Sequence, residues 1–357
     1  MLHFHPLKVK DIRKETNDCV SISFHIPQEL QQVFSYKPGQ YLTLKATVNG
    51  EETRRSYSLC SAPASGQWRI AVKKVDGGAF SVYANEQLKA GDTLEVLPPL
   101  GHFTTDCHPA NKKDYVGFAA GSGITPLLSI VSTVLQTEPG SRFTLVYGNK
   151  NRHSIIFREE LEALKNRYME RFRVIHVLSR EVTDATINSG RIDADKCDAL
   201  FTKFANIQAD EFFICGPEQM IFCVRDFLLA KGVDKKKVHF ELFTTPGQAQ
   251  AAATKRNASV DEGPKSKVTI KLDGRTFDFE LSHEGESVLD AALRKGADLP
   301  YSCKGGVCCS CRAKLVEGEV DMDVNYALEE DEVKQGFILT CQSHPKTPHV
   351  VIDYDVK

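Results

Sequence analysis

Four cysteines lie within nine residues of this chain, in the stretch 303–311 that reads CKGGVCCSC, and a fifth follows at Cys341. Four residues separate Cys303 from Cys308, two separate Cys308 from Cys311, and twenty-nine separate Cys311 from Cys341. Thiolates that all point at one small group force the backbone to coil around it, which excludes a regular helix or strand. The two glycines of the stretch permit positive φ and bring backbone N–H groups close to the sulfurs. We therefore expect a metal-binding loop.

The spacing C-x4-C-x2-C…C is that of a [2Fe–2S] ligand set, so the expected metal ligands are Cys303, Cys308, Cys311 and Cys341. Zinc is the alternative, but zinc loops usually pair cysteines as C-x2-C on both sides. Cys309 is interpreted as a non-ligand, because using it in place of Cys308 breaks the spacing. The other cysteines are scattered and most are interpreted as ordinary free thiols; they are Cys19, Cys60, Cys107, Cys197, Cys215 and Cys223.

Length and charge narrow the class of protein. A chain of 357 residues is too long for one typical core, so two or three domains are expected. The net charge of −2 shows no excess of basic residues of the kind that would indicate nucleic-acid binding. The N-terminus has no apolar signal-peptide region, and no apolar run has membrane-spanning length. We expect a cytoplasmic protein with neither a nucleic-acid nor a membrane partner, in which many cysteines indicate metal or redox chemistry.

The chain changes character along its length, which predicts a multidomain fold. Short alternating stretches in residues 1–105 predict an antiparallel β-barrel or a sandwich, with one helix near 79–89. Apolar runs alternate with helical patterns in 106–243, which predicts an α/β domain with a parallel sheet. Residues 244–266 are rich in Ala, Gly and polar residues and are expected to be a flexible linker. Residues 267–357 are expected to form a small α+β domain, with a hairpin turning at Asp273-Gly274 and a helix capped by Ser287.

A glycine turn in the second segment indicates a nucleotide site. The stretch GSGITP follows the predicted strand YVGFAA and opens a helix, which is the arrangement of a phosphate cradle built from Gly121, Gly123, Thr125 and Pro126. It is not the Rossmann fingerprint, because Pro126 takes the place of the third glycine and no acidic residue ends the next strand. A single glycine turn is weak support, since many such turns bind nothing.

The later strand VIHVLSR ends in Ser179 and Arg180, and Arg191 follows in SGR. A hydroxyl and two guanidinium groups suit a 2′-phosphate, which favours NADPH, although NADH stays possible. The alternative is that these arginines are only solvated. A second turn, at Cys215 and Gly216 in CGP, follows the strand EFFI, and parallel sheets bind ligands at such turns. Cys215 is either a small buried residue or a residue at the nicotinamide.

The first two segments resemble the ferredoxin–NADP reductase-like flavoproteins. The resemblance is carried by KPGQY, RSYS, PLGHF, GSGITP and CGP in the expected order. It implies that Tyr57 stacks on a flavin, that Arg55 neutralises its pyrophosphate and that Ser58 hydrogen-bonds its ring. It also implies pyrophosphate contacts from the turn and helix start that contain Gly78, Phe80 and Ser81. Glu241 and Phe243 match the acidic and aromatic residues that end such reductases; with Tyr57, Ser58 and Cys215 they are the expected catalytic residues.

Residues 267–357 resemble a plant-type ferredoxin, which implies a β-grasp fold and a one-electron carrier. The order of segments resembles that of reductase components of multicomponent oxygenases. That resemblance implies electron flow from NADPH to FAD to [2Fe–2S] to an oxygenase partner, because a flavin converts two-electron into one-electron transfer. FMN is the alternative flavin. Within this family, RRSYS, AAGSGITP and LDAALRKGADLPYSCKGGVC resemble the reductase subunits of the di-iron phenylacetyl-CoA epoxidases. Alternative partners are a Rieske oxygenase, a membrane or steroid hydroxylase, or a hybrid-cluster protein. A different interpretation is that the chain is itself a carrier or assembly module with a degenerate flavin site.

Overall fold

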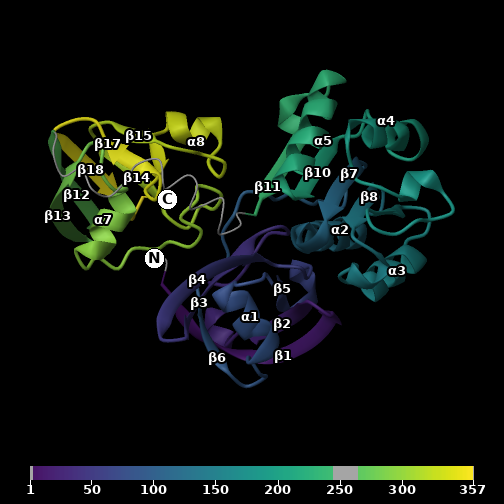
Figure 1. Ribbon diagram of the computed structural model, residues 1–357, viewed down its shortest axis with the longest axis horizontal. Helices are drawn as coiled ribbons and strands as arrows, with labels where there is room; N and C mark the ends of the chain where they lie inside the picture. The colour runs from purple at the N-terminus through teal and green to yellow at the C-terminus, as the bar shows by residue number, and fades with distance from the viewer. Residues whose placement is uncertain (1–2, 244–263, 357) are drawn as a thin grey trace. The chain divides into compact units, whose positions relative to one another are not determined.

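The computed structural model describes residues 3–243 and 264–356, and its chain divides into two compact units (Figure 1). One unit contains a six-stranded antiparallel sheet and a five-stranded parallel sheet, and the other contains the C-terminal sheets. This is the expected multidomain fold class. Most of the expected linker, 244–266, lies outside the described residues, and the first C-terminal strand already begins at Lys265. Within the described residues, no helix is long and apolar enough to cross a membrane.

The six-stranded sheet has the order β4-β3-β6-β1-β2-β5. Its edges β4 and β5 are joined by a bridge between Leu59 and Ile70, which closes the sheet on itself. Alternating side chains such as Ile22, Leu42 and Leu44 are buried inside it. The helix expected near 79–89 is α1. The elements are β1 (His5–Thr16), β2 (Cys19–His25), β3 (Tyr41–Val48), β4 (Glu51–Ser58), β5 (Trp68–Lys73), α1 (Ala79–Glu86) and β6 (Thr93–Val96).

The five-stranded sheet is parallel, with the order β11-β10-β7-β8-β9. Helices cover both faces: Leu127 of α2 packs on the face that carries Leu145, while Phe201 of α4 stacks near Phe118 on the other face. The elements are β7 (Asp114–Ala120), α2 (Ile124–Thr137), β8 (Arg142–Asn149), α3 (Arg158–Arg167), β9 (Phe172–Leu178), α4 (Ala194–Lys203), β10 (Glu211–Gly216), α5 (Glu218–Ala230) and β11 (Val238–Leu242).

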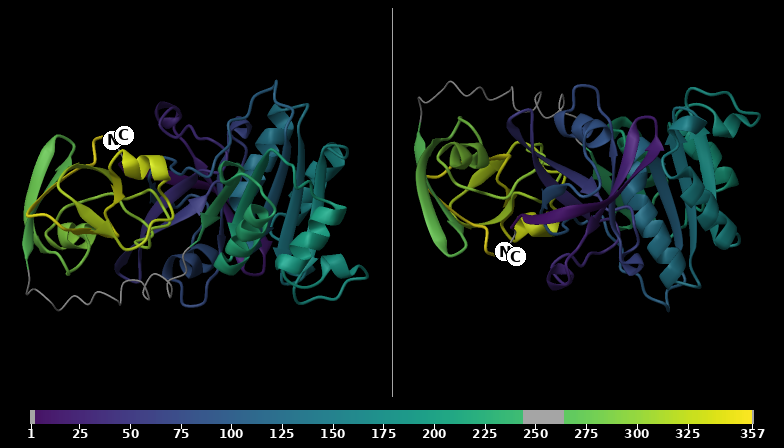
Figure 2. Two further views of the ribbon diagram at one scale, coloured as in Figure 1. Left: turned by 90° about the horizontal axis from the view of Figure 1, so that it is seen from above. Right: turned by 90° about the horizontal axis from the view of Figure 1, so that it is seen from below.

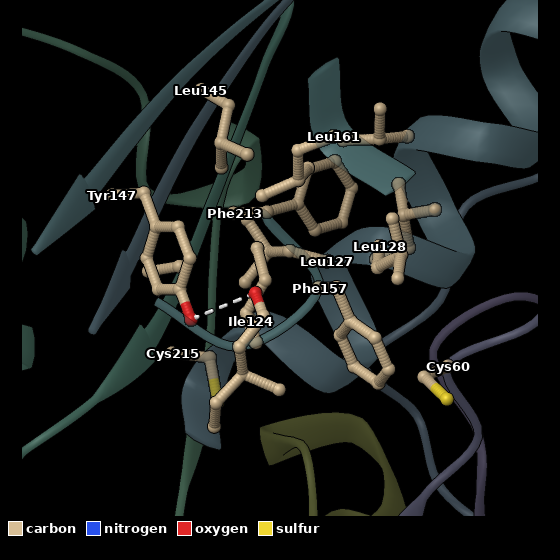
Figure 3. Close-up of a cluster of buried hydrophobic side chains, with 14 of the residues drawn as sticks. Cys60, Ile124, Leu127, Leu128, Leu145, Tyr147, Phe157, Leu161, Phe213 and Cys215 are labelled. Carbon is tan, nitrogen blue, oxygen red and sulfur yellow. Dashed lines mark hydrogen bonds between the residues drawn. The ribbon is translucent and has the colours of Figure 1, made fainter. Parts of the chain in front are cut away.

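The two sheets of this unit are packed against each other through α2 and α3. Arg69 of β5 forms an ion pair with Glu160 of α3 at 2.6 Å, and Ser129 of α2 donates a hydrogen bond to the Ser61 carbonyl at 2.6 Å. Cys60, which follows β4, lies in the same apolar cluster as Phe157 (Figure 3). A shared apolar cluster therefore joins the two segments, while most of the barrel interior forms a cluster of its own.

The C-terminal unit has a mixed sheet in the order β13-β12-β18-β14-β16. Its strands are drawn in green and yellow in Figure 2. Asp273 and Gly274 both have positive φ between β12 and β13, which confirms the expected hairpin turn. Ser287 Oγ accepts a hydrogen bond from the Asp290 amide and caps α7, as expected. The elements are β12 (Lys265–Leu272), β13 (Arg275–Ser282), α7 (Val288–Arg294), β14 (Arg312–Glu317), β15 (Val320–Met322), α8 (Glu330–Lys334), β16 (Phe337–Leu339), β17 (Ser343–Pro345) and β18 (His349–Asp353).

Candidate functional site

The end of β4 and the start of α1 bring the flavin-type residues together. The ring of Tyr57 lies 5.6 Å from that of Phe80, at an interplanar angle of 33°. Arg55 is exposed, and its guanidinium donates to the neighbouring Arg54 carbonyl at 2.7 Å. An aromatic side chain and an exposed cation are thus two residues apart on one strand. The aromatic side chain suits a flavin ring, and the cation suits a pyrophosphate.

The turn before α1 is held by its own polar groups. Ser81 Oγ accepts from the Val75 amide at 3.1 Å and donates to the Gly78 carbonyl at 3.2 Å. The Gly78 amide donates to the Val75 carbonyl, and a Cβ at Gly78 would lie 2.6 Å from Ser81 Oγ. Gly78 and Ser81 therefore shape the turn. The amides that remain for an anion are those of the first turn of α1, around Phe80.

Ser58, Cys215 and Glu241 meet where the two sheets adjoin. Buried Ser58 donates a hydrogen bond to Glu241 Oε2 at 3.1 Å, and Glu241 is the register partner of Cys215 across β10 and β11. Burial raises the pKa of Glu241 to about 8, which the hydrogen bond from Ser58 partly offsets. Burial, and next the charge of Glu241, raise the pKa of the Cys215 thiol well above its ordinary value. Cys215 is therefore a small neutral contact, and Glu241 holds a proton at neutral pH.

Phe243 follows β11 directly and is 36% exposed. It lies two residues beyond Glu241, so the last strand of the parallel sheet carries both expected residues to the same end. The exposed ring is available to a ligand at that edge.

The glycine turn after β7 is packed tightly against the turn after β10. A Cβ at Gly123 would lie 2.1 Å from the Cys215 carbonyl oxygen, and a Cβ at Gly216 would lie 3.1 Å from the Ala120 amide nitrogen. Gly121 has φ of +55°, which suits glycine. These glycines bring two backbone segments together at the carboxyl edge of the sheet, which is where open parallel sheets bind ligands.

The first turn of α2 completes this edge. Thr125 is buried and donates its hydroxyl to the Ser122 carbonyl at 3.0 Å, while buried Pro126 lacks an amide hydrogen and needs no acceptor. Thr125 thus shapes the turn. Lys73 Nζ, from β5, lies 3.9 Å from the Cβ position of Gly121. Sequence reasoning missed this cation, because it reaches the turn from the other sheet and carries no local signal.

Ser179, Arg180 and Arg191 lie at the end of β9. The Arg180 amide donates to the Lys150 carbonyl at 2.8 Å, and the Gly190 amide donates to the Leu178 carbonyl at 2.9 Å. A parallel bridge between Leu178 and Ser189 places the segment before Arg191 beside the one that leads to Arg180. Both arginines are exposed, and across residues 3–243 and 264–356 neither forms an ion pair, whereas Arg152 is paired with Glu181. Two guanidinium groups near one edge fit an anionic group such as a phosphate.

The cysteine loop of the second unit gathers its thiols. Cys308 Sγ lies 3.1 Å from Cys303 Sγ, and the Gly305 amide donates to Cys303 Sγ at 3.3 Å. Hydrogen bonds from Cys308, from Cys341 and from backbone amides lower the pKa of the Cys303 thiol well below its ordinary value. Cys341 also has Cys311 as a hydrogen-bonding neighbour. Thiolates are the form that binds iron.

Backbone geometry explains why the loop can coil this tightly. Lys304 and Gly306 both have positive φ, and a Cβ at Gly306 would lie 2.9 Å from the Val324 carbonyl oxygen. Cys309 is buried and donates to the Ala327 carbonyl at 3.4 Å. Over the described residues, no three His, Cys, Asp or Glu side chains converge as ligands of one metal ion. Cys303 adjoins Cys308, and Cys341 has hydrogen-bonding contacts with both Cys303 and Cys311, so all four expected ligands are linked to one another as a small iron–sulfur cluster requires.

Three family descriptions match the chain in succession. Residues 6–105 match the oxidoreductase FAD-binding domain, 118–226 the oxidoreductase NAD-binding domain, and 270–346 the 2Fe-2S iron-sulfur cluster binding domain. These matches agree with the three parts of the fold and with the pyridine-nucleotide, FAD and [2Fe–2S] cofactors expected from the sequence.

Curated relatives span the whole chain. One of the subunits of 1,2-phenylacetyl-CoA epoxidase from Escherichia coli (strain K12) is 46% identical over 358 residues, covering 100% of this chain and 99% of the relative. The ferredoxin reductase component of 3-ketosteroid-9-alpha-monooxygenase from Rhodococcus rhodochrous is 34% identical, covering 98% and 96%. The glycine betaine monooxygenase reductase subunit of Pseudomonas aeruginosa (strain UCBPP-PA14) is 30% identical, covering 98% and 95%.

A solved structure agrees with these relatives. Phthalate dioxygenase reductase, described as a modular structure for electron transfer from pyridine nucleotides to [2Fe–2S], is 26% identical with a TM-score of 0.59, and the match covers 98% of each chain. The chain therefore belongs to the family of oxidoreductases that serve as reductase components of multicomponent oxygenases, with FAD-binding, NAD-binding and [2Fe–2S] domains in this order.

Proposed function

We propose that this reductase takes electrons from NADPH and delivers them singly to the di-iron oxygenase component of a phenylacetyl-CoA epoxidase. The identity of 46% over essentially the whole chain to a component of the Escherichia coli epoxidase supports this partner. The structural observation that carries the electron path is the meeting of Ser58, Cys215 and Glu241 at the junction of the two sheets. Flavin-type and nucleotide-type residues share this site, so a nicotinamide and a flavin ring can be brought together there.

The residues of the proposed flavin site have distinct tasks. Tyr57 presents its ring beside Phe80, and Arg55 offers a cation to a pyrophosphate. Cys215 is neutral and small, so it lets a planar ring approach the sheet edge. Glu241 keeps a proton up to a pH of about 8 and is hydrogen-bonded to Ser58, so this pair can hold or move a proton at the flavin face. Bound flavin supplies the conversion from two-electron to one-electron transfer.

The carboxyl edge of the parallel sheet is the proposed nucleotide site. The turn Gly121–Gly123, the first turn of α2 and the nearby Lys73 suit a pyrophosphate. Ser179, Arg180 and Arg191 suit the 2′-phosphate that distinguishes NADPH from NADH, because the guanidinium groups have no carboxylate partner in the described part of the chain. Phe243 stands at the β11 end of the same edge, beyond Glu241.

Cys303, Cys308, Cys311 and Cys341 are the proposed ligands of the [2Fe–2S] cluster. The close approach of Cys303 and Cys308, with the amide of Gly305 aimed at the sulfur, supports this set over one that contains Cys309. Within the described ranges no disulfide joins any two cysteines, which fits a reducing compartment, and we propose the cytoplasm as the location.

An anaerobic titration with NADPH, followed by visible absorption, tests the order of carriers. Both flavin and iron–sulfur bands should bleach as NADPH is added. A preparation whose flavin bleaches while cluster bands are missing would show that the cysteine loop holds no cluster.

Reconstitution tests the partner. The reductase should support NADPH-dependent turnover by a phenylacetyl-CoA epoxidase oxygenase component, with product measured by mass spectrometry. A 3-ketosteroid monooxygenase component serves as the comparison, because a reductase of that system is 34% identical. Faster turnover with the steroid component would replace the proposed partner.

A further inference from the structure

A buried glutamine lies directly beside the proposed cluster ligands. Gln342 follows Cys341 in the chain and is 6% exposed. Its backbone is held on both sides, since its amide donates to the Leu339 carbonyl at 2.9 Å and its carbonyl accepts from the Asp323 amide at 3.0 Å. The side chain therefore has little freedom to turn away from the loop.

Three acceptors surround the carboxamide nitrogen of Gln342. Nε2 lies 3.0 Å from the Lys304 carbonyl oxygen, 2.9 Å from the Cys341 carbonyl oxygen and 3.6 Å from Cys341 Sγ. A carboxamide oxygen in that position would face three acceptors and no donor, so the environment assigns the nitrogen to it. The amide carries two hydrogens, so one of them is shared between a carbonyl oxygen and Cys341 Sγ, and in this way the Gln342 side chain donates to the sulfur of a proposed ligand.

The same contact joins the two arms of the cysteine loop. Lys304 belongs to the first arm, directly after Cys303, and is in the left-handed conformation with φ of +51°. Cys341 belongs to the second arm, which enters from β16. Gln342 Nε2 bridges the two, and its Cγ lies 3.2 Å from the Cβ position of Gly306, so the side chain fills the space beneath the loop.

We propose that Gln342 is a positioning and tuning residue of the iron–sulfur centre, raising its reduction potential by donating a hydrogen bond to Cys341 Sγ. The inference rests on the proposed ligand set and deepens it. Reduction adds one electron and therefore negative charge, part of which resides on the sulfurs. A donor aimed at a sulfur stabilises the reduced, more negative state of the cluster more than the oxidised state. Such hydrogen bonds help to set the reduction potentials of these clusters.

Two substitutions of Gln342 remove its hydrogen-bond donor while keeping most of the side-chain volume. Gln342→Leu keeps much of the volume and removes the donor, and Gln342→Glu keeps the shape and replaces the donor with an anionic acceptor. Gln335→Leu is the matched control, because Gln335 is an exposed residue at the end of α8 in the same unit. The readout is the midpoint potential of the full-length holoprotein, from a dye-mediated titration followed by EPR of the reduced centre.

Gln342→Leu should lower the equilibrium constant for reduction about tenfold, which is about 59 mV for a one-electron couple. Gln342→Glu should lower it further, and Gln335→Leu should leave it unchanged. A midpoint potential that is the same in wild type and both Gln342 variants, or higher in either, would overturn the inference. Wild-type protein without iron–sulfur absorption would instead overturn the proposed function, so the two failures are distinguishable.

Selective 15N labelling of glutamine side chains keeps the test open if a variant loses its cluster. Pulsed EPR of reduced wild-type protein should then show a nitrogen coupling from a glutamine amide. Absence of that coupling in wild-type protein with an intact reduced centre would contradict the hydrogen bond to Cys341 Sγ.

Discussion

Gly123→Ala should disrupt the proposed nucleotide site while leaving the iron–sulfur unit intact. The added Cβ would lie 2.1 Å from the Cys215 carbonyl oxygen, 2.4 Å from the Cys215 carbonyl carbon and 2.8 Å from the Gly216 nitrogen. Ordinary van der Waals contact begins at 3.4 Å, so the closest contact is about 1.3 Å too short. All three atoms belong to the backbone, and no side chain can rotate to relieve the overlap.

The expected cost follows from that displacement. Overpacking of a well-packed core costs about 1–3 kcal/mol, and backbone atoms place this site at the upper end. Displacement of the β7 turn from the β10 turn by about 1 Å is large enough to lower catalysis about 100-fold. Because each tenfold loss corresponds to about 1.36 kcal/mol, this loss is about 2.7 kcal/mol of transition-state stabilisation.

The assay is kcat/KM for NADPH-dependent reduction of a dye that accepts electrons from the flavin. Gly232→Ala is the control, because Gly232 lies between α5 and β11 and no atom lies within 4 Å of its Cβ position; its φ of +84° disfavours alanine, whereas Gly123 has an ordinary φ of −61°. The cluster EPR signal after chemical reduction should equal that of wild type in both variants. A Gly123→Ala enzyme whose kcat/KM stays within twofold of wild type would refute the claim that this approach of two backbones builds the site.

Three further predictions concern individual side chains. Glu241→Gln should make thermal stability less dependent on pH. Folded Glu241 keeps a proton that the unfolded chain releases above its ordinary pKa of 4.5, so the stability of the wild type falls as pH rises toward 8. Equal slopes of melting temperature against pH in both proteins would contradict this. Cys308→Ser should abolish electron delivery to a protein acceptor yet leave NADPH-dependent dye reduction within about twofold of wild type, because the dye takes electrons before the cluster; equal loss of both activities would contradict the order of carriers. Arg180→Ala should raise KM for NADPH about tenfold and leave KM for NADH nearly unchanged, since one charge-assisted phosphate contact contributes about 1.5–3 kcal/mol; an unchanged preference would remove the 2′-phosphate assignment.

The sequence predicted best where local chemistry dictates structure. Asp273-Gly274 specified its turn and Ser287 its helix cap, and the first two cysteines of the predicted ligand set, Cys303 and Cys308, lie 3.1 Å apart at Sγ. It was weakest where structure depends on residues far apart in the chain. Lys73 reaches the nucleotide turn from the other sheet, and the raised pKa of Glu241 depends on burial that only the packed sheets produce.

Two predicted residues make contacts that their motifs do not specify. Ser81 and Thr125 lie in the expected turns, but their hydroxyls bind backbone carbonyls of those turns. A short motif contains both residues that stabilise a turn and residues that bind a ligand there, and the sequence alone does not distinguish the two roles. Gln342 carried no signal at all, because a polar residue after a cysteine is ordinary until its burial is known.

The hydrogen bond between Ser58 and Glu241 spans 183 residues of sequence and two sheets. With the ion pair of Arg69 and Glu160, it makes the barrel and the parallel sheet dependent on each other for the proposed flavin face. A gene fragment that encodes only residues 1–105 would produce a barrel without the proton-holding partner of Ser58. A recombination event that moves this chemistry to a protein with another electron acceptor must therefore transfer both sheets together.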